Sequence, residues 1–292
     1  MSADTIKHWQ VGGVTIARIV EVNAWVDDIT MLLPEATPEY VRGFKWLQPH
    51  FATPEGKMII NFQCFVLSSR GRNVMIDTCI GADREREFPV FTNMQTTFLE
   101  DLAFAGFPHE TITDVLCTHL HFDHVGWNTR KVDGKWVPTF PQARYLFGRR
   151  EFEHWKHLRD TNGYHHMAHL EDAIDPVMEA GLVELIDPDF QLTDEVSLIP
   201  TPGHTPGHVS VLIQSQGRSA VITGDIMHNP IQIAVPATEA RFDMDKAQGA
   251  QTRVEFVERF NDSGTLVIGS HFADPSAGHI VPDGAAWKLK AD

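Results

Sequence analysis

The segment 118–124 carries four potential metal ligands within six residues, in the order His119, His121, Asp123 and His124. Imidazole nitrogens and carboxylate oxygens suit zinc, iron, cobalt and manganese. A short apolar run precedes the segment and is typical of a buried strand. In an extended chain His119 and His121 point to one side, and a turn that starts at Asp123 would direct Asp123 and His124 to a second point nearby. The spacing therefore favours two metal ions over one.

A solvated His/Asp loop and a structural zinc knot are the alternatives for this segment. Other His and Asp residues at the ends of apolar runs favour a catalytic metal site over both. His204 lies in a loop rich in Pro and Gly after the run 196–199, Asp225 ends the run 220–225, and His271 ends the run 265–271. Strand ends are the places where a rigid scaffold presents functional groups to a site.

Five ordered motifs resemble those of the metallo-β-lactamase-fold hydrolases, within them the branch of acyl-homoserine lactonases, glyoxalase II and methyl-parathion-hydrolase-like enzymes. The motifs span most of the chain and are Met75-Ile-Asp77-Thr78, the HxHxDH segment, His204, Asp225 and His271. The resemblance implies a first metal ion on His119, His121 and His204, a second on Asp123, His124 and His271, and Asp225 as the bridge.

Three side chains are expected to take part in the chemistry, namely Asp77, Asp123 and His228. Asp77 stands at the end of a predicted buried strand, where an unpaired carboxylate is costly, so we expect it to accept a hydrogen bond from a ligand imidazole or a backbone amide. His228 follows Asp225 by three residues, where acyl-homoserine lactonases commonly have Tyr. A neutral imidazole there could donate to the substrate carbonyl or protonate the leaving alkoxide, and a loop His bonded to the backbone is the alternative.

A dinuclear site activates water and polarises a carbonyl or phosphoryl oxygen without a Ser or Cys nucleophile. Asp225 stands where zinc β-lactamases with a thiolate ligand have Cys, and His121 stands where flavodiiron oxygen reductases have Glu. Only a short segment follows His271, whereas glyoxalase II normally adds a C-terminal helical domain. The sequence therefore predicts a hydrolase of small lactones or carboxylic esters with two divalent metal ions, zinc first and iron, cobalt or manganese as alternatives. Thioester or organophosphate hydrolysis, a mononuclear iron persulfide dioxygenase and an inactive metal-binding scaffold remain open.

The composition limits the partners. The net charge is −15, with 39 acidic and 24 basic residues, which repels nucleic acid and anionic membranes. The chain shows neither a signal peptide nor an apolar run long enough to span a bilayer, so we expect a cytoplasmic protein. Cys64, Cys79 and Cys117 fit neither a CxxC motif nor a disulfide framework and are expected to be buried and reduced. A homodimer is left open.

The periodicity predicts one domain over residues 1–292, an αββα sandwich of two mixed β-sheets with outer helices. Strands are expected at 14–22, 58–68, 74–77, 114–117, 143–147, 182–186, 196–200, 209–213, 220–223 and 265–269, with a hairpin around 133–134. Helices are expected at 93–107, within a histidine-rich helical insert at 149–180, and at 245–261.

Residues 23–56 show no regular period apart from a short helix near 38–44. Long apolar loops act as lids or binding walls, or they cover a sheet edge, and both interpretations stay open here. The wall would consist of Trp25, Met31, Leu32, Leu33, Trp46 and Phe51. In the helical insert, the histidines lack the carboxylate-rich context of the main motif, so we expect them not to bind metal; they are His154, His157, His165, His166 and His169.

Overall fold

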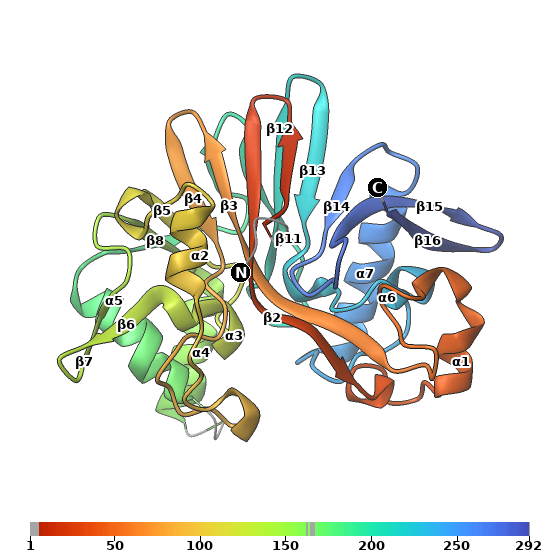
Figure 1. The fold of residues 1–292 in the computed structure, drawn as a ribbon, viewed down its shortest axis with the longest axis horizontal. Helices are drawn as coiled ribbons and strands as arrows, with labels where there is room; N and C mark the ends of the chain where they lie inside the picture. The colour runs from red at the N-terminus through yellow and green to blue at the C-terminus, as the bar shows by residue number, and fades with distance from the viewer. Residues whose placement is uncertain (1–5, 162, 164–166, 292) are drawn as a thin grey trace.

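A computed structural model describes residues 6–161, 163 and 167–291. Two seven-stranded sheets lie at the centre, and helices cover the outer face of each (Figure 1). Both sheets are mixed, because each contains antiparallel pairs and at least one parallel pair. The predicted αββα sandwich is therefore confirmed.

The first sheet consists of the N-terminal strands. In spatial order they are β1 (His8–Val11), β2 (Val14–Asp27), β3 (Met58–Ser69), β4 (Arg72–Ile76), β5 (Asp114–Leu116), β8 (Arg144–Gly148) and β9 (Val183–Ile186). A separate hairpin of β6 (Thr129–Val132) and β7 (Lys135–Pro138) turns at Asp133-Gly134, as the sequence predicts.

The second sheet consists of the C-terminal strands. In spatial order they are β10 (Gln191–Thr193), β11 (Val196–Pro200), β12 (Val209–Ser215), β13 (Arg218–Ile222), β14 (Leu266–Ile268), β15 (Ala277–Asp283) and β16 (Ala286–Ala291). Strands β15 and β16 form a hairpin that was not predicted, although Asp283-Gly284 between two alternating runs is a turn signal.

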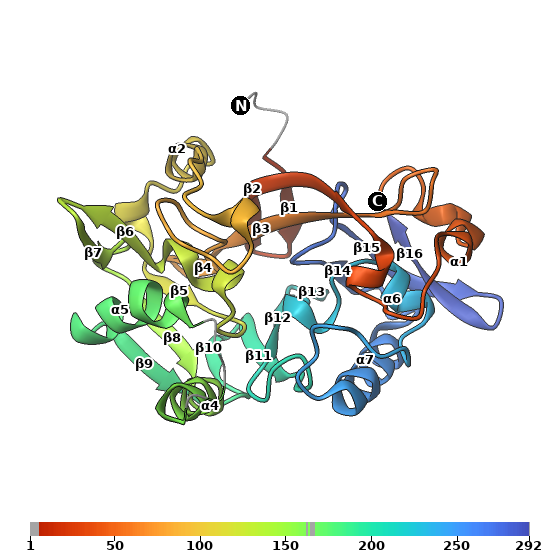
Figure 2. The same ribbon diagram turned by 90° about the horizontal axis from the view of Figure 1, so that it is seen from below.

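The helices divide between the two sheets. They are α1 (Pro38–Gly43), α2 (Phe98–Phe104), α3 (Phe122–Val125), α4 (Arg149–Asp160), α5 (Asp175–Glu179), α6 (Ile231–Ala234) and α7 (Lys246–Phe260). Figures 1 and 2 place α2 and α5 in the half of the first sheet and α6 and α7 in the half of the second. None of the described helices is long and apolar enough to cross a bilayer.

Alternation along the strands separates the layers of the core. In β4, Val74 and Ile76 belong to the cluster between the two sheets, while Met75 faces the cluster that includes Phe98 and Trp155 of the outer helices. In β13, Ile222 belongs to the cluster between the two sheets, and its neighbour Val221 belongs to a different cluster, which includes Phe256 and Phe260 of α7. Successive side chains of a strand point to opposite faces, so each sheet is buried on both sides.

Two predicted elements have the wrong length. Strand β2 runs on to Asp27 instead of ending at 22, because two bulges between Val20 and Trp25 bend the strand while it stays paired with β3. The helix predicted at 93–107 is limited to α2, because Asn93 and its neighbours bond instead to residues 83–84. The three cysteines are free and buried, as predicted.

Candidate metal centre

The HxHxDH segment occupies the junction between strand β5 and helix α3. His119 follows the strand, and His121 is the extended residue just before the helix. Asp123 and His124 lie in the single turn of α3, so they project in a different direction from the first two histidines. Strand ends in the other sheet deliver His204, Asp225 and His271 to the same place. The structure thus brings all seven residues together.

The first group of ligand atoms consists of three imidazole nitrogens. His121 Nδ1 lies 3.0 Å from His119 Nε2 and 2.8 Å from His204 Nε2. His119 and His204 are buried, and His121 is half-buried. Three nitrogens this close share one small volume.

The second group combines two imidazoles with two carboxylates. His271 Nε2 lies 3.3 Å from His124 Nε2 and 3.5 Å from Asp123 Oδ2. His124 Nε2 lies 3.7 Å from the same Asp123 oxygen. Asp225 completes this group.

Asp225 lies between the two groups and turns one oxygen to each. Its Oδ1 is 3.1 Å from His124 Nε2 and 3.2 Å from His271 Nε2. Its Oδ2 is 3.5 Å from His204 Nε2 and 3.8 Å from His119 Nε2. A carboxylate placed in this way has the geometry of a bridge between two cations.

These spacings fit divalent metal ions. Ligand atoms about 2.1 Å from a tetrahedral ion lie roughly 3.4 Å from one another, close to the separations in both groups. His124 Nδ1 faces Asp77 Oδ2 at 2.9 Å, and His271 Nδ1 faces the Asn61 carbonyl oxygen at 2.8 Å. These contacts leave the Nε2 lone pair of each ring for a metal ion. Lone pairs that face one another are repulsive unless a cation or a proton lies between them.

The protonation of the buried groups also fits a metal site. Burial lowers the pKa of His119, His121 and His204 well below its ordinary value, so these imidazoles are neutral. Burial also disfavours charge on His124, but the neighbouring carboxylates, Asp225 first, raise its pKa well above the ordinary value. Burial would raise the pKa of Asp225, yet the surrounding imidazoles hold it well below the usual range. A bound cation would displace such protons as the partner of the carboxylate.

Asp77 supports the site from behind, in the contact expected from the sequence. Its carboxylate accepts hydrogen bonds from the Thr118 backbone N–H at 2.7 Å and from His124 Nδ1 at 2.9 Å. It is buried, and its φ of 60° is unusual for a residue other than Gly. The contact fixes both the orientation of His124 and the start of the HxHxDH segment.

His228 lies against the predicted metal ligands. Its Nε2 is 3.2 Å from Asp225 Oδ2, and its ring is nearly parallel to that of His271, with 5.3 Å between ring centroids. Among the described residues its Nδ1 has no hydrogen-bond partner, so the side chain is not bonded to the backbone there. His228 therefore offers a nitrogen to the site and could act either on a substrate or as a further ligand.

Two residues that hold the site in place were not predicted. Glu151, in the first turn of α4, accepts hydrogen bonds from Leu120 N, Trp155 Nε1 and Gly207 N at 3.1, 2.7 and 3.0 Å. It thereby joins the two loops that carry the first ligand group. An acidic residue in the first turn of a helix is common, so the sequence contains no signal for this role.

His208 is the second of these residues. Its Nε2 accepts a 2.8 Å hydrogen bond from the backbone N–H of Asp225, and burial lowers the pKa of His208 to about 4, which keeps it neutral. Gly224, at φ 57°, leaves room for this ring, because a Cβ there would lie 2.5 Å from His208 Nε2. The repeated Thr-Pro-Gly-His at 201–208 was the available signal.

The apolar wall differs from the predicted one. Leu32, Leu33 and Phe51 are fully buried in the core of the second half, so they do not line a binding surface. Trp25, also a member of the predicted wall, begins an aromatic chain that does reach the site. Trp25 contacts Phe91, Phe91 contacts Phe62, and Phe62 contacts His271, with ring centroids 5.5, 4.9 and 5.2 Å apart. An apolar loop pattern alone does not distinguish core from wall.

The described histidines of the helical insert lie outside the ligand groups. Among the described residues, His154, His157 and His169 belong to no cluster of metal-binding side chains. His169 packs on Trp155, which in turn packs on His121. His165 and His166 lie outside the described residues.

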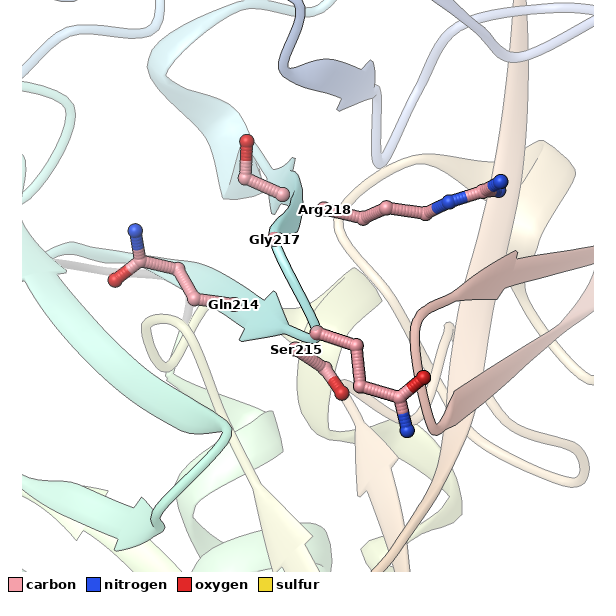
Figure 3. A pocket seen from close by; sticks show the side chains of 6 residues that line it. Gln214, Ser215, Gly217 and Arg218 are labelled. Atoms are coloured by element: carbon pink, nitrogen blue, oxygen red, sulfur yellow. The ribbon is translucent and has the colours of Figure 1, made fainter.

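Figure 3 shows a hollow at the turn between β12 and β13, lined by residues 214–219. It lies at the end of β12 away from His208, roughly 20 Å along the strand at 3.3 Å per residue. Its lining contains no potential metal ligand, so this hollow is unrelated to the metal centre.

Comparison with known proteins gives consistent results. A family model described as the metallo-beta-lactamase superfamily matches residues 63–273. An N-acyl homoserine lactonase from Bacillus sp is 24% identical over 221 residues, which cover 70% of this chain and 79% of that protein. The solved structure of AidC, a dizinc quorum-quenching lactonase in complex with a product, N-hexanoyl-L-homoserine, aligns with a TM-score of 0.79 at 20% identity, over 98% of this chain and 97% of that one. The hydrolase AbOPH of the beta lactamase superfamily aligns with a TM-score of 0.77 at 24% identity, over 97% and 96%.

Proposed function

Because the chain belongs to the metallo-β-lactamase superfamily, we propose that it is a dinuclear metal-dependent hydrolase that opens lactones or cleaves carboxylic esters. The observation that carries the proposal is the placement of Asp225, whose two oxygens face two separate groups of ligand atoms. The names of the lactonase relatives support the substrate class. The second ligand group favours this reading over a mononuclear iron dioxygenase.

In this proposal His119, His121 and His204 hold one ion, Asp123, His124 and His271 hold the other, and Asp225 bridges them. Zinc is our first choice, with iron, cobalt and manganese as alternatives. When bound, two such ions supply a Lewis acid for the carbonyl group and an activated water for the attack. Asp77 keeps His124 in the tautomer that leaves Nε2 free.

Asp123 and His228 complete the chemistry of the chain. Asp123 is less buried than Asp225, the other carboxylate among the seven ligands. It is therefore placed both to bind the metal ion and to orient the attacking water. His228, 3.2 Å from Asp225, is placed to hold the proton that the leaving alkoxide takes up. Its edge-to-face neighbour His204 and its stacked neighbour His271 restrict the ring to one orientation.

The surroundings of the site suit an uncharged substrate with an apolar side. Phe242 lies beside His228, with ring centroids 5.7 Å apart, and it is 37% exposed. Met244, two residues on, is 38% exposed, and its backbone N–H bonds the His204 carbonyl, so this loop forms a rim of the site. Apolar side chains at a rim bind acyl chains, whereas the net charge of −15 opposes strongly anionic substrates.

The proposal is tested on the metal-loaded protein with acyl-homoserine lactones, aryl esters, a phosphotriester, a glutathione thioester and a β-lactam. We expect two metal ions per chain and the highest kcat/KM for a lactone or carboxylic ester. A highest kcat/KM for the thioester or the β-lactam would refute the substrate class. One iron with oxygen uptake would support a dioxygenase, and tight metal without turnover would support a scaffold.

The role of His228 is tested separately with His228→Phe. The loss of a general acid should lower lactone kcat at least about tenfold. Turnover of an aryl ester with a good leaving group should fall less, because its leaving oxygen needs no proton. Equal losses for both substrates would argue against proton donation, and metal analysis of the variant would show whether His228 acts as a ligand instead.

A further inference from the structure

We infer that Asp243 is a positioning residue for His204 and that, held by Arg253, it sets the affinity of the first metal position. The inference rests on the proposed metal site and adds a residue to it. Asp243 lies in the loop between α6 and α7, and Arg253 lies within α7. Both side chains are almost completely buried, at 0% and 1% exposure.

The two nitrogens of His204 face different partners. Nε2 lies in the first ligand group, 2.8 Å from His121 Nδ1. When Nε2 binds a metal ion, the proton of the neutral ring must be on Nδ1. Nδ1 faces Asp243 Oδ1 at 3.6 Å, about half an ångström beyond a normal hydrogen bond. Among the described residues, neither of these two atoms has a hydrogen-bond partner.

Asp243 is fixed in place by Arg253. The guanidinium donates from Nη1 to Asp243 Oδ2 at 2.7 Å and from Nη2 to the Thr238 carbonyl at 2.8 Å. The arginine therefore balances the charge of the carboxylate, and it joins helix α7 to the loop that carries Asp243. Because the arginine occupies Oδ2, the free oxygen of Asp243 is the one directed at His204.

The backbone on both sides leaves room for this contact. Gly249 lies inside α7, a position where Gly destabilises a helix. A larger residue would not fit, because its Cβ would lie 2.4 Å from Asp243 Oδ2. Gly203, at φ 131°, packs on Gly249, since its Cβ would lie 2.3 Å from the Gly249 Cα. Two glycines thus allow α7 and the loop of His204 to approach Asp243 closely.

A carboxylate behind a metal-bound histidine fixes the tautomer and orientation of the ring and raises its basicity. Removal of such a partner typically weakens metal binding by about ten- to a hundredfold. Asp77 makes the equivalent contact with His124 in the second group. Each half of the site would then have one histidine backed by a buried carboxylate.

The alternative is a purely structural ion pair that joins α7 to the preceding loop. The variant Asp243→Asn separates the two, and Asp172→Asn is the matched control. Asp172 is also a buried carboxylate paired with arginines, at 2.6 Å from Arg84 Nη1 and 2.7 Å from Arg86 Nη1, but it contacts no ligand histidine in the described structure. The measurements are competitive titration of zinc against a chromophoric chelator, the spectrum of the cobalt-substituted protein, and Tm.

We expect Asp243→Asn to weaken one of two zinc equivalents by about ten- to a hundredfold, to alter the cobalt spectrum, and to leave the other equivalent unchanged. Asp172→Asn should lower Tm with unchanged zinc affinities. Wild-type affinities for both equivalents in Asp243→Asn would overturn the inference. If that variant does not fold, Arg253→Lys is tested in its place. We then expect a smaller loss of zinc affinity, again for one of the two equivalents. Wild-type affinities in Arg253→Lys would refute the inference. A wild-type protein that binds no zinc, iron, cobalt or manganese would instead refute the proposed function.

Discussion

Replacement of Glu151 by Gln should loosen the first half of the metal centre without touching a ligand. The carboxylate accepts three hydrogen bonds, from Leu120 N, Trp155 Nε1 and Gly207 N. Leu120 lies between two ligand histidines, and Gly207 follows His204 by three residues. Since Gln has a single acceptor oxygen, its NH₂ group must face at least one of these donors.

The size of the effect follows from this count. If the amide oxygen keeps the bonds to Leu120 and Trp155, the N–H of Gly207 is left unsatisfied, which costs about 1–3 kcal/mol. The two remaining bonds lose the contribution of the charge, about 1 kcal/mol each, and the neutral amide is easier to bury. The net loss should be about 2–3 kcal/mol. For a chain of this size that corresponds to a decrease in Tm of roughly 3–5 °C.

Calorimetry and metal titration together check this prediction. We expect a lower Tm and about tenfold weaker binding of one metal equivalent, because the HxHxDH loop and the His204 loop are no longer held together. Glu153→Gln is the control, since Glu153 lies on the same helix and is exposed. An unchanged Tm in Glu151→Gln, or equal loss of both metal equivalents, would refute the reasoning.

Three further predictions follow from the site. Asp225→Ala should lose one metal ion and nearly all turnover, because no other carboxylate faces both ligand groups among the described residues; two metals and a normal rate would contradict the bridge. His154→Ala combined with His157→Ala should leave the metal content unchanged by elemental analysis, and stoichiometric loss would overturn the ligand scheme. Phe242→Ala should raise KM for long-chain acyl substrates about three- to tenfold and spare short ones, since it removes exposed apolar surface beside His228; equal effects on both would argue against an acyl-binding rim.

The layers of the fold and the residues of the candidate metal centre could be predicted from the sequence. Alternation in runs such as 74–76 and 220–222 separates inner from outer faces in any sheet that is covered on both sides. His119 to His124 lie close together in any fold, because they are only a few residues apart. His204, Asp225 and His271 were recognisable because each follows an apolar run, which places it at a strand end.

How these residues face one another depends on tertiary contacts that the sequence pattern does not show. The backbone N–H of Asp225 is bonded to His208, for which Gly224 leaves room, and this contact joins segments that are apart in the sequence. Glu151 reaches partners 31 and 56 residues away in the sequence, so its role exists only after the loops have packed.

The apolar residues of 23–56 show the same limit. Leu32, Leu33 and Phe51 are apolar as a binding wall would be, but they are buried in the core, while Phe62 contacts His271 from outside this segment. Hydrophobic burial is not directional, so composition predicts that such side chains leave water but not which surface covers them. That choice is made by the bend in β2 and by the packing of the second half, both of which depend on contacts between distant parts of the chain.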